Sequence, residues 1–155
     1  MRAQDPTKYS LQISGLPTVR ENVNYNTART PADVAELCKD LQPLAQEAFV
    51  VITLNTRNNV IDKQLITLGL LDASLVHPRE VFRKAIGDGA FALILVHNHP
   101  SGDPSPSSQD IRITKQLIDA GKIIDIKVLD HIIIGKSTTD DPGYVSIRES
   151  RAVSF

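Results

Sequence analysis

Short apolar runs between turn signals predict that this chain forms a β-sheet. Residues 48–54 are rich in β-branched side chains and predict a strand, and residues 60–68 predict a second one. The residues at 56–59 are typical of a turn, so we expect the two strands to form a hairpin. Residues 91–96 are all apolar and predict a buried strand. Further strands are expected at residues 123–129, 131–134 and 144–147, with a short edge strand at 9–13.

Apolar residues at helical spacing predict helices between these strands. Thr30 and Pro31 are typical of a helix start, with an N-cap side chain and a proline at the first helical position. The apolar face that follows recurs at i, i+3, i+4 and i+7 and ends before Pro43: Val34, Leu37, Cys38 and Leu41. A second helix is expected from Pro78 to about Ile86, closed by the glycines that follow it.

The third predicted helix follows a polar, proline-rich segment. Ser105 is the expected N-cap and Pro106 the first helical residue, and Gly121 should end the helix after Ala120. Its inner stripe is expected to consist of Ile111, Thr114, Leu117 and Ile118. Because helices and strands alternate after residue 70, we expect an α/β fold in which helices pack on the faces of a mixed sheet.

Length and composition are those of one ordinary globular domain. The chain has 155 residues, of which 41% are hydrophobic and 23% charged. We expect residues 1–29 to be an N-terminal extension and residues 30–155 to be the domain. No apolar run approaches the ~18 residues that span a bilayer, and no signal-peptide pattern is present, so we expect a cytoplasmic protein with no membrane partner. The single Cys38 suits a reducing compartment, and its place on an apolar helix face predicts a buried thiol rather than a nucleophile.

The residues that carry chemistry begin where the apolar run at 91–96 ends. His97 and His99 are two positions apart, so in an extended strand both side chains point the same way while Asn98 points away. Asp110 adds a carboxylate from the next element. Two imidazoles and a carboxylate, with a fourth position left for water, are typical of a catalytic zinc site and not of a closed structural one.

The same residues also have simpler explanations. Histidines two apart are common by chance, and Ser107 with Asp110 alone could be a helix capping box. If Ser105 caps the helix instead, Ser107 and Asp110 are free of capping and lie three apart on one helix face, where both can be directed toward the histidine pair. The combination of these residues therefore indicates a metal site, which none of them indicates alone.

The charge balance bears on the kind of partner. The chain carries 17 basic and 18 acidic residues, which gives a formal net charge of −1. Proteins that bind nucleic-acid phosphates usually have a basic surplus. The composition therefore disfavours nucleic acid as the partner.

The spacing of the motif resembles the signature of a known superfamily. His97-x-His99, a seven-residue spacer and Ser107-x-x-Asp110 are similar to the signature of the JAB/JAMM metalloproteases. The longer string HNHPSGDPSPS at 97–107, with VLDHIIIG at 128–135, resembles the RadC-type branch of bacterial JAB domains. The resemblance covers about residue 45 to about residue 151. It implies a three-layer α-β-α fold with a mixed sheet, the JAB/MPN fold, which is similar to cytidine deaminases. Full-length RadC proteins also carry a helix-hairpin-helix-like region, which we do not expect in this sequence, so the resemblance is to their short single-domain relatives.

This resemblance implies a reaction and a ligand set. His97, His99 and Asp110 would hold one catalytic Zn2+ for hydrolysis of a peptide or isopeptide bond. The partner would be a peptide or protein substrate, which the sequence does not identify. Ser107 would hydrogen-bond the developing oxyanion, with an ordinary first-turn helix serine as the alternative.

Attack of water on an amide also needs a base outside the ligand set. Two glutamates are candidates. Glu80 lies in the first turn of a predicted helix, where an acid is favoured by the helix dipole alone. Glu47 lies just ahead of the strand at 48–54, and this position matches the base glutamate of JAMM domains. The resemblance therefore favours Glu47.

Two other functions remain as alternatives. One is a nucleic-acid-associated module related to DNA repair, which would require a basic face and a salt-dependent affinity. The other is an inactive metal-binding interaction domain.

Three further polar residues have structural explanations. His131 lies among apolar residues, which is more typical of a hydrogen-bonded core histidine, with support of the metal ligands as the alternative. His77 is expected at a helix entry, and Asp103 with Gly102 in a turn.

Overall fold

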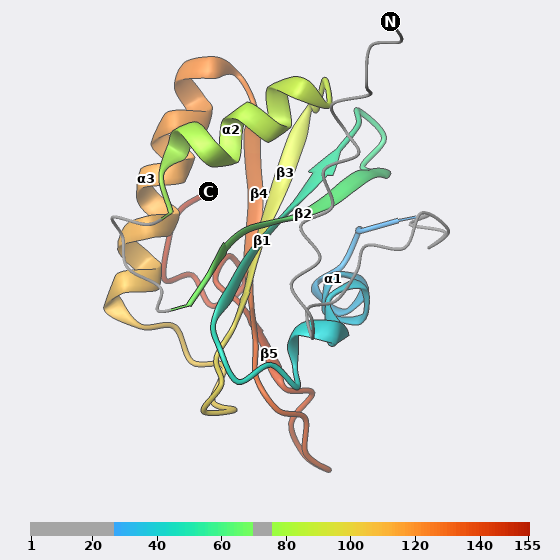
Figure 1. The fold of residues 1–155 in the computed structure, drawn as a ribbon, viewed down its shortest axis with the longest axis vertical. Helices are drawn as coiled ribbons and strands as arrows, with labels where there is room; N and C mark the ends of the chain where they lie inside the picture. Colours follow the sequence, from blue (N-terminus) through green and yellow to red (C-terminus); the bar gives the residue numbers. More distant parts are fainter. Residues whose placement is uncertain (1–26, 70–75) are drawn as a thin grey trace, which may run out of the picture.

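The computed structural model describes residues 27–69 and 76–155, which form a five-stranded mixed sheet between two layers of helices. Helix α1 lies on one face of the sheet, and α2 and α3 lie on the other (Figure 1). This is the α/β architecture expected of a JAB/MPN domain. The edge strand predicted at 9–13 falls outside the described residues.

The sheet has the strand order β2-β1-β3-β4-β5. The strands are β1 (Ala48–Leu54), β2 (Val60–Leu68), β3 (Ala92–Asn98), β4 (Lys127–Ile134) and β5 (Tyr144–Ser146). Only β3 and β4 pair in parallel, and the other neighbours are antiparallel. A parallel pair needs a crossover connection, and α3 supplies it. The predicted hairpin of β1 and β2 is confirmed.

The three predicted helices are present among the described residues. They are α1 (Pro31–Leu37), α2 (Pro78–Gly87) and α3 (Ser108–Ile124), and a short 3-10 turn, η2 (Lys39–Leu41), follows α1. Thr30 is the N-cap of α1, as expected, and forms a capping box with Asp33. None of these helices combines the length and apolar character that crossing a bilayer requires.

Helix α3 does not begin where the sequence analysis expected. Its N-cap is Ser107 and not Ser105, and its first helical residue is Ser108 and not Pro106. The backbone N–H of Ser105 is already bonded to the carboxylate of Asp103 at 2.9 Å, which holds Ser105 in a turn. Ser107 is the first residue whose side chain can accept a hydrogen bond from the α3 backbone.

The end of α3 is also later than predicted. Gly121 does not terminate the helix, which continues to Ile124 and is closed by Asp125 in the left-handed conformation. A Cβ at position 121 would lie 2.4 Å from the carbonyl oxygen of Ile126. Gly121 is therefore needed because the backbone at Ile126, just after the end of the helix, packs against this position, and not because it ends the helix.

In place of the two strands predicted at 123–129 and 131–134 the structure has a single strand, β4, which begins only at Lys127 because residues 123 and 124 still belong to α3. The strand continues through Asp130 without a break. The buried carboxylate of Asp130 accepts hydrogen bonds from the hydroxyl of Ser146 and from the backbone N–H groups of His131 and Arg148. With these partners a carboxylate is tolerated inside a strand.

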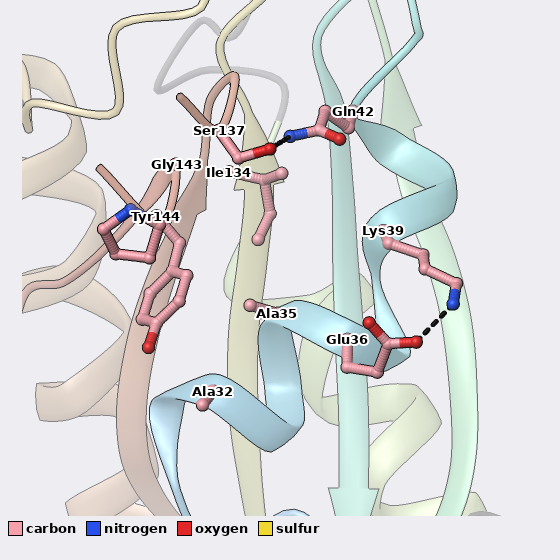
Figure 2. Close-up of a pocket in the computed structure, with 10 residues that line it drawn as sticks. Ala32, Ala35, Glu36, Lys39, Gln42, Ile134, Ser137, Gly143 and Tyr144 are labelled. Atoms are coloured by element: carbon pink, nitrogen blue, oxygen red, sulfur yellow. Dashed lines mark hydrogen bonds and ion pairs between the residues drawn. The ribbon is translucent and has the colours of Figure 1, made fainter. Parts of the chain in front are cut away.

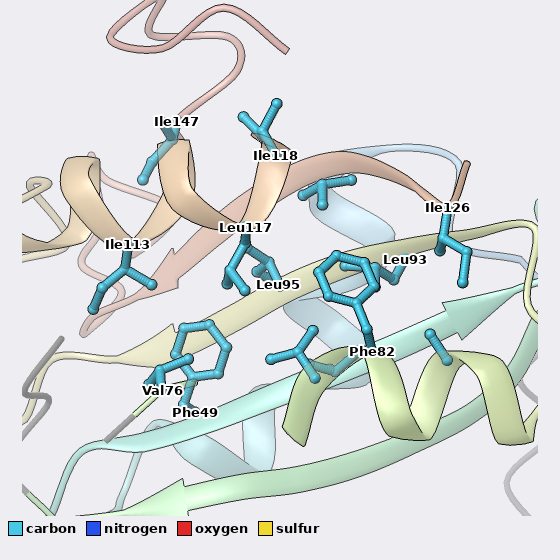
Figure 3. Packing of buried hydrophobic residues seen from close by; sticks show 14 of the residues in the cluster. Phe49, Val76, Phe82, Leu93, Leu95, Ile113, Leu117, Ile118, Ile126 and Ile147 are labelled. Atoms are coloured by element: carbon cyan, nitrogen blue, oxygen red, sulfur yellow. The ribbon is translucent and has the colours of Figure 1, made fainter. Parts of the chain in front are cut away.

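Alternate residues of the central strands enter two separate cores. Phe49, Leu93 and Leu95 pack against α2 and α3, as Figure 3 shows. Val50 and Ile94 enter the second core under α1. Since His97 continues the first series, its side chain is directed toward α3.

Candidate metal centre

The three predicted metal ligands converge where β3 ends and α3 begins. His97 belongs to β3, His99 follows the end of that strand, and Asp110 lies in the first turn of α3. The Nε2 atom of His97 is 3.0 Å from Nε2 of His99 and 3.2 Å from Oδ1 of Asp110. Nε2 of His99 is 3.3 Å from Oδ2 of Asp110. These residues form a group that could hold a metal ion.

The donor set fits zinc. Zinc bonds of about 2.0–2.1 Å to nitrogen and oxygen place neighbouring tetrahedral ligand atoms about 3.3 Å apart. The distances from Nε2 of His97 to Nε2 of His99 and to Oδ1 of Asp110, 3.0 and 3.2 Å, are close to that value, while the 3.3 Å contact of His99 is with the other carboxylate oxygen, Oδ2. Two imidazoles and one carboxylate occupy three corners of a tetrahedron, which leaves the fourth to water or substrate.

The charges at the site favour a cation. Burial alone would raise the pKa of Asp110, but its contacts with His97 and His99 outweigh burial and hold that pKa far below its usual range. The hydrogen bond to Asp110 raises the pKa of His99 against the effect of burial. The site therefore attracts positive charge, and a proton and a metal ion compete for it.

The capping box of α3 and the metal ligands share residues. Oδ2 of Asp110 accepts the backbone N–H of Ser107 at 2.7 Å, and Oγ of Ser107 accepts the backbone N–H of Asp110 at 3.1 Å. The prediction that Ser107 and Asp110 are free of capping is therefore wrong. The capping box instead fixes the carboxylate of Asp110 beside the two histidines, while the hydroxyl hydrogen of Ser107 is not used in it.

Glu47 lies beside this site, at the residue before β1. It is partly buried, and its carboxylate is close enough to His99 to raise the pKa of that imidazole. Glu80 is elsewhere, on the exposed side of α2, where it pairs with Arg83 at 3.1 Å. Of the two glutamates, the structure therefore brings Glu47, and not Glu80, near His99.

Asn98 holds the segment that carries Glu47, a role that the sequence analysis missed. Its side chain points away from His97 and His99, as predicted. Its Oδ1 accepts the backbone N–H of Ala48 at 2.7 Å, and its Nδ2 donates to the carbonyl of Gln46 at 3.0 Å. Both neighbours of Glu47 are thus fixed by a residue that lies between the two histidines. An asparagine between the two histidines, just after the apolar run at 91–96, was the available signal.

His131 is completely buried behind His97. Its Nε2 is 2.8 Å from Nδ1 of His97, and its Nδ1 is 2.6 Å from the hydroxyl of Thr114 on α3. The ring of Phe49 packs against both imidazoles, stacked on His97 and edge-on to His131. Burial lowers the pKa of His131 well below its usual value, which keeps this ring neutral.

His77 and Asp103 lie in the local structures that were predicted for them. His77 is the N-cap of α2 and accepts the backbone N–H of Arg79 through Nδ1. Asp103 forms a turn with Ser105. Its backbone carbonyl also accepts Nδ1 of His99 at 2.8 Å, so this turn orients a candidate ligand.

A separate hollow lies on the other face of the sheet. It is formed between α1 and β5, and its wall includes Glu36, Lys39, Gln42 and Tyr144 (Figure 2). Gln42 reaches across it to Ser137, while Glu36 pairs with Lys39. None of the candidate metal ligands lines it.

Comparison with known proteins agrees with this geometry. The sequence profile of the RadC-like JAB domain family matches residues 28–152. A UPF0758 protein of Alkaliphilus metalliredigens is 50% identical over 133 residues, which cover 85% of this chain and 55% of the relative. UPF0758 proteins of Halalkalibacterium halodurans and of a Geobacillus species are 46% identical over 139 residues and 52% identical over 131 residues. These matches cover 89% and 82% of this chain, and 57% and 56% of the relatives. The chain thus spans little more than half the length of these relatives.

Proposed function

The chain belongs to the RadC-like JAB domain family, and from this premise we propose that it is a zinc-dependent hydrolase that cleaves a peptide or isopeptide bond. The observation that carries the proposal is the convergence of His97, His99 and Asp110 within 4.8 Å, with the carboxylate of Glu47 beside them. The metal would be held by these three side chains. When bound, zinc would lower the pKa of a water molecule and polarise the carbonyl of the scissile bond.

Glu47 acts as the general base and then as the general acid. Its carboxylate takes the proton of the attacking water and returns it to the leaving amine. The hydrogen bonds of Asn98 to the residues on either side of Glu47 keep the carboxylate in place during both transfers. Glu47 is not one of the three ligands, so its proton transfers do not change the ligand set.

Ser107 supplies a hydrogen bond to the oxygen that becomes negative. Its oxygen accepts the backbone N–H of Asp110, which fixes the side chain and leaves the hydroxyl hydrogen to be donated. A donor that is already oriented stabilises charge in the transition state without having to reorganise.

Two glutamate variants test the assignment. Protein purified without chelator should carry about one zinc per chain, measured by elemental analysis. Glu47→Gln should retain that zinc and abolish cleavage in a screen of fusion proteins and isopeptide-linked conjugates. Glu80→Gln is the matched control on the exposed side of α2 and should keep its activity. Loss of zinc in Glu47→Gln, or the opposite ranking of the two variants, would contradict the roles assigned here.

A further inference from the structure

A continuous chain of hydrogen bonds connects two of the candidate ligands, His97 and Asp110, through residues that do not face the metal site. Nδ1 of His97 meets Nε2 of His131, Nδ1 of His131 meets the hydroxyl of Thr114, and that hydroxyl meets the backbone carbonyl of Asp110 at 2.6 Å. His131 and Thr114 are fully buried. The chain of contacts starts on β3, passes through β4 and ends on α3.

The hydrogen positions in this chain follow from one group that can only accept. The carbonyl of Asp110 has no hydrogen, so the hydroxyl of Thr114 must donate to it. That hydroxyl has no second hydrogen, so it accepts from Nδ1 of His131. A neutral His131 protonated at Nδ1 has a lone pair at Nε2, which accepts from Nδ1–H of His97. His97 then has a lone pair at Nε2, on the side of the metal site.

We propose that Thr114 and His131 are positioning residues that fix His97 in the tautomer required of a metal ligand. The inference rests on the proposed metal site and explains how one of its ligands is prepared before the metal arrives. A buried imidazole with an undefined partner at Nδ1 could carry its hydrogen on either nitrogen, and one tautomer would block the metal. The chain of hydrogen bonds from His97 through His131 and Thr114 to Asp110, called the relay below, excludes the tautomer of His97 that would block the metal.

His99 is prepared in the same way by a shorter route. Its Nδ1 donates to the carbonyl of Asp103, which again can only accept, so in the neutral ring Nε2 also presents a lone pair. The proton that Asp110 favours at this Nε2 is the one with which a metal ion competes. His77, outside the site, has the opposite arrangement, because its Nδ1 accepts the N–H of Arg79 and its hydrogen must be on Nε2. His77 is therefore an internal reference for the other tautomer within the same protein.

Nuclear magnetic resonance of the imidazole nitrogens tests the relay directly in metal-free protein. The chain has four histidines, which makes assignment practical. At about pH 8, where a free histidine is neutral, His131 should carry its hydrogen on Nδ1 and His77 on Nε2. A hydrogen on Nε2 of His131 would overturn the proposal, whatever the protein does with zinc.

Two pairs of variants test whether the relay matters for metal binding. Thr114→Val removes the hydroxyl at nearly constant shape, and Thr114→Ser keeps it. His131→Leu removes both hydrogen bonds of the ring, to His97 and to Thr114. The amide in His131→Gln can replace them, because it can accept from His97 and donate to Thr114. Changes to groups that orient metal ligands typically cost about 10–100-fold in affinity. We expect that loss of zinc affinity in the first member of each pair, and affinity close to wild type in the second.

Zinc affinity is measured by competition with a chromogenic chelator, on variants whose folding is checked by circular dichroism. Equal affinity within both pairs, beside tight binding by the wild type, would overturn the relay and leave the metal site standing. A wild type that binds no zinc would instead overturn the proposed function. The tautomer measurement on metal-free protein decides the relay in either case, including when a variant fails to fold.

Discussion

His97, His99 and Asp110 could be predicted from the sequence because each lies at a fixed chain offset from the others. The partners that orient them could not. His131 is 34 residues from His97, and Asn98 binds a carbonyl 52 residues away. These contacts exist only once β3 has paired with β1 and β4, and strand pairing is not encoded in local spacing. The expectation that His131 is a hydrogen-bonded core residue is confirmed, and its hydrogen bond to His97 also fits the alternative that it supports a metal ligand.

Cys38 allows a test at the scale of one residue. Burial raises the pKa of its thiol to about 12 and outweighs the positive charge of Lys63, which lowers it. We expect a chromogenic disulfide reagent at about pH 8 to leave the folded protein unmodified and to react with about one thiol in denaturant. Rapid reaction of the native protein would contradict the burial of this residue.

The sign of the associated pH effect follows from the same shift. The pKa of Cys38 is higher in the folded protein than its usual 9.0, so the folded state favours the protonated thiol. This contribution to the free energy of unfolding is complete below the usual pKa and is lost as pH rises from about 9 toward about 12.

At the scale of elements, the first two strands were easier to predict than the ends of α3. The bounds of β1 and β2 agree with the prediction because apolar runs and turn residues mark them without reference to other elements. The start of α3 was placed too early because Pro106, which suits a first helical position, made Ser105 the favoured cap in the sequence. The turn that Asp103 forms with Ser105 is what excludes it.

Gly121 and Gly87 form a matched pair on two helices. A Cβ at Gly121 would lie 2.4 Å from a backbone oxygen, whereas a Cβ at Gly87 would meet nothing within 4 Å. Alanine is the better helix former by about 1 kcal/mol, so Gly87→Ala should be neutral or stabilising by up to that amount. Gly121→Ala should lower the free energy of unfolding by about 1–3 kcal/mol, because the crossing chain must move. Urea denaturation measures both, and equal effects would show that the crossing at Ile126 is not tight.

A comparison of the two capping boxes distinguishes the contribution of helix capping to stability from the proposed role of Ser107 in cleavage. Ser107 with Asp110 begins α3 at the metal site, and Thr30 with Asp33 begins α1 on the opposite face. Ser107→Ala and Thr30→Ala should each cost about 1 kcal/mol in the free energy of unfolding. Both should keep zinc, since the backbone N–H of residue 107 still holds Asp110. Only Ser107→Ala should also slow cleavage, by about 10²–10³-fold for one lost oxyanion donor. Equal cleavage rates in Ser107→Ala and Thr30→Ala would show that Ser107 acts only as a helix cap.

At the scale of the whole molecule, the family and the α/β fold could be predicted because the motif at 97–110 is specific and lies on a predictable strand and helix. The substrate could not be predicted in the same way. A metal site is defined by a few atoms, but recognition of a protein or peptide uses surfaces formed by distant segments. Charge is the property of the whole chain that still bears on the partner.

That property separates the proposed hydrolase from a nucleic-acid-associated module. With 17 basic and 18 acidic residues, the chain offers no surplus of cations to release counterions from phosphates. We expect weak, sequence-independent binding to a labelled DNA duplex in fluorescence anisotropy. Because few phosphates would be contacted, the affinity should fall only shallowly between about 50 and about 200 mM salt. His97→Ala and zinc removal should leave this affinity unchanged, since the proposed function places an amide and not a phosphate at the site. Tight binding at physiological salt that disappears in His97→Ala would show that the metal serves nucleic acid and would replace the hydrolase proposal.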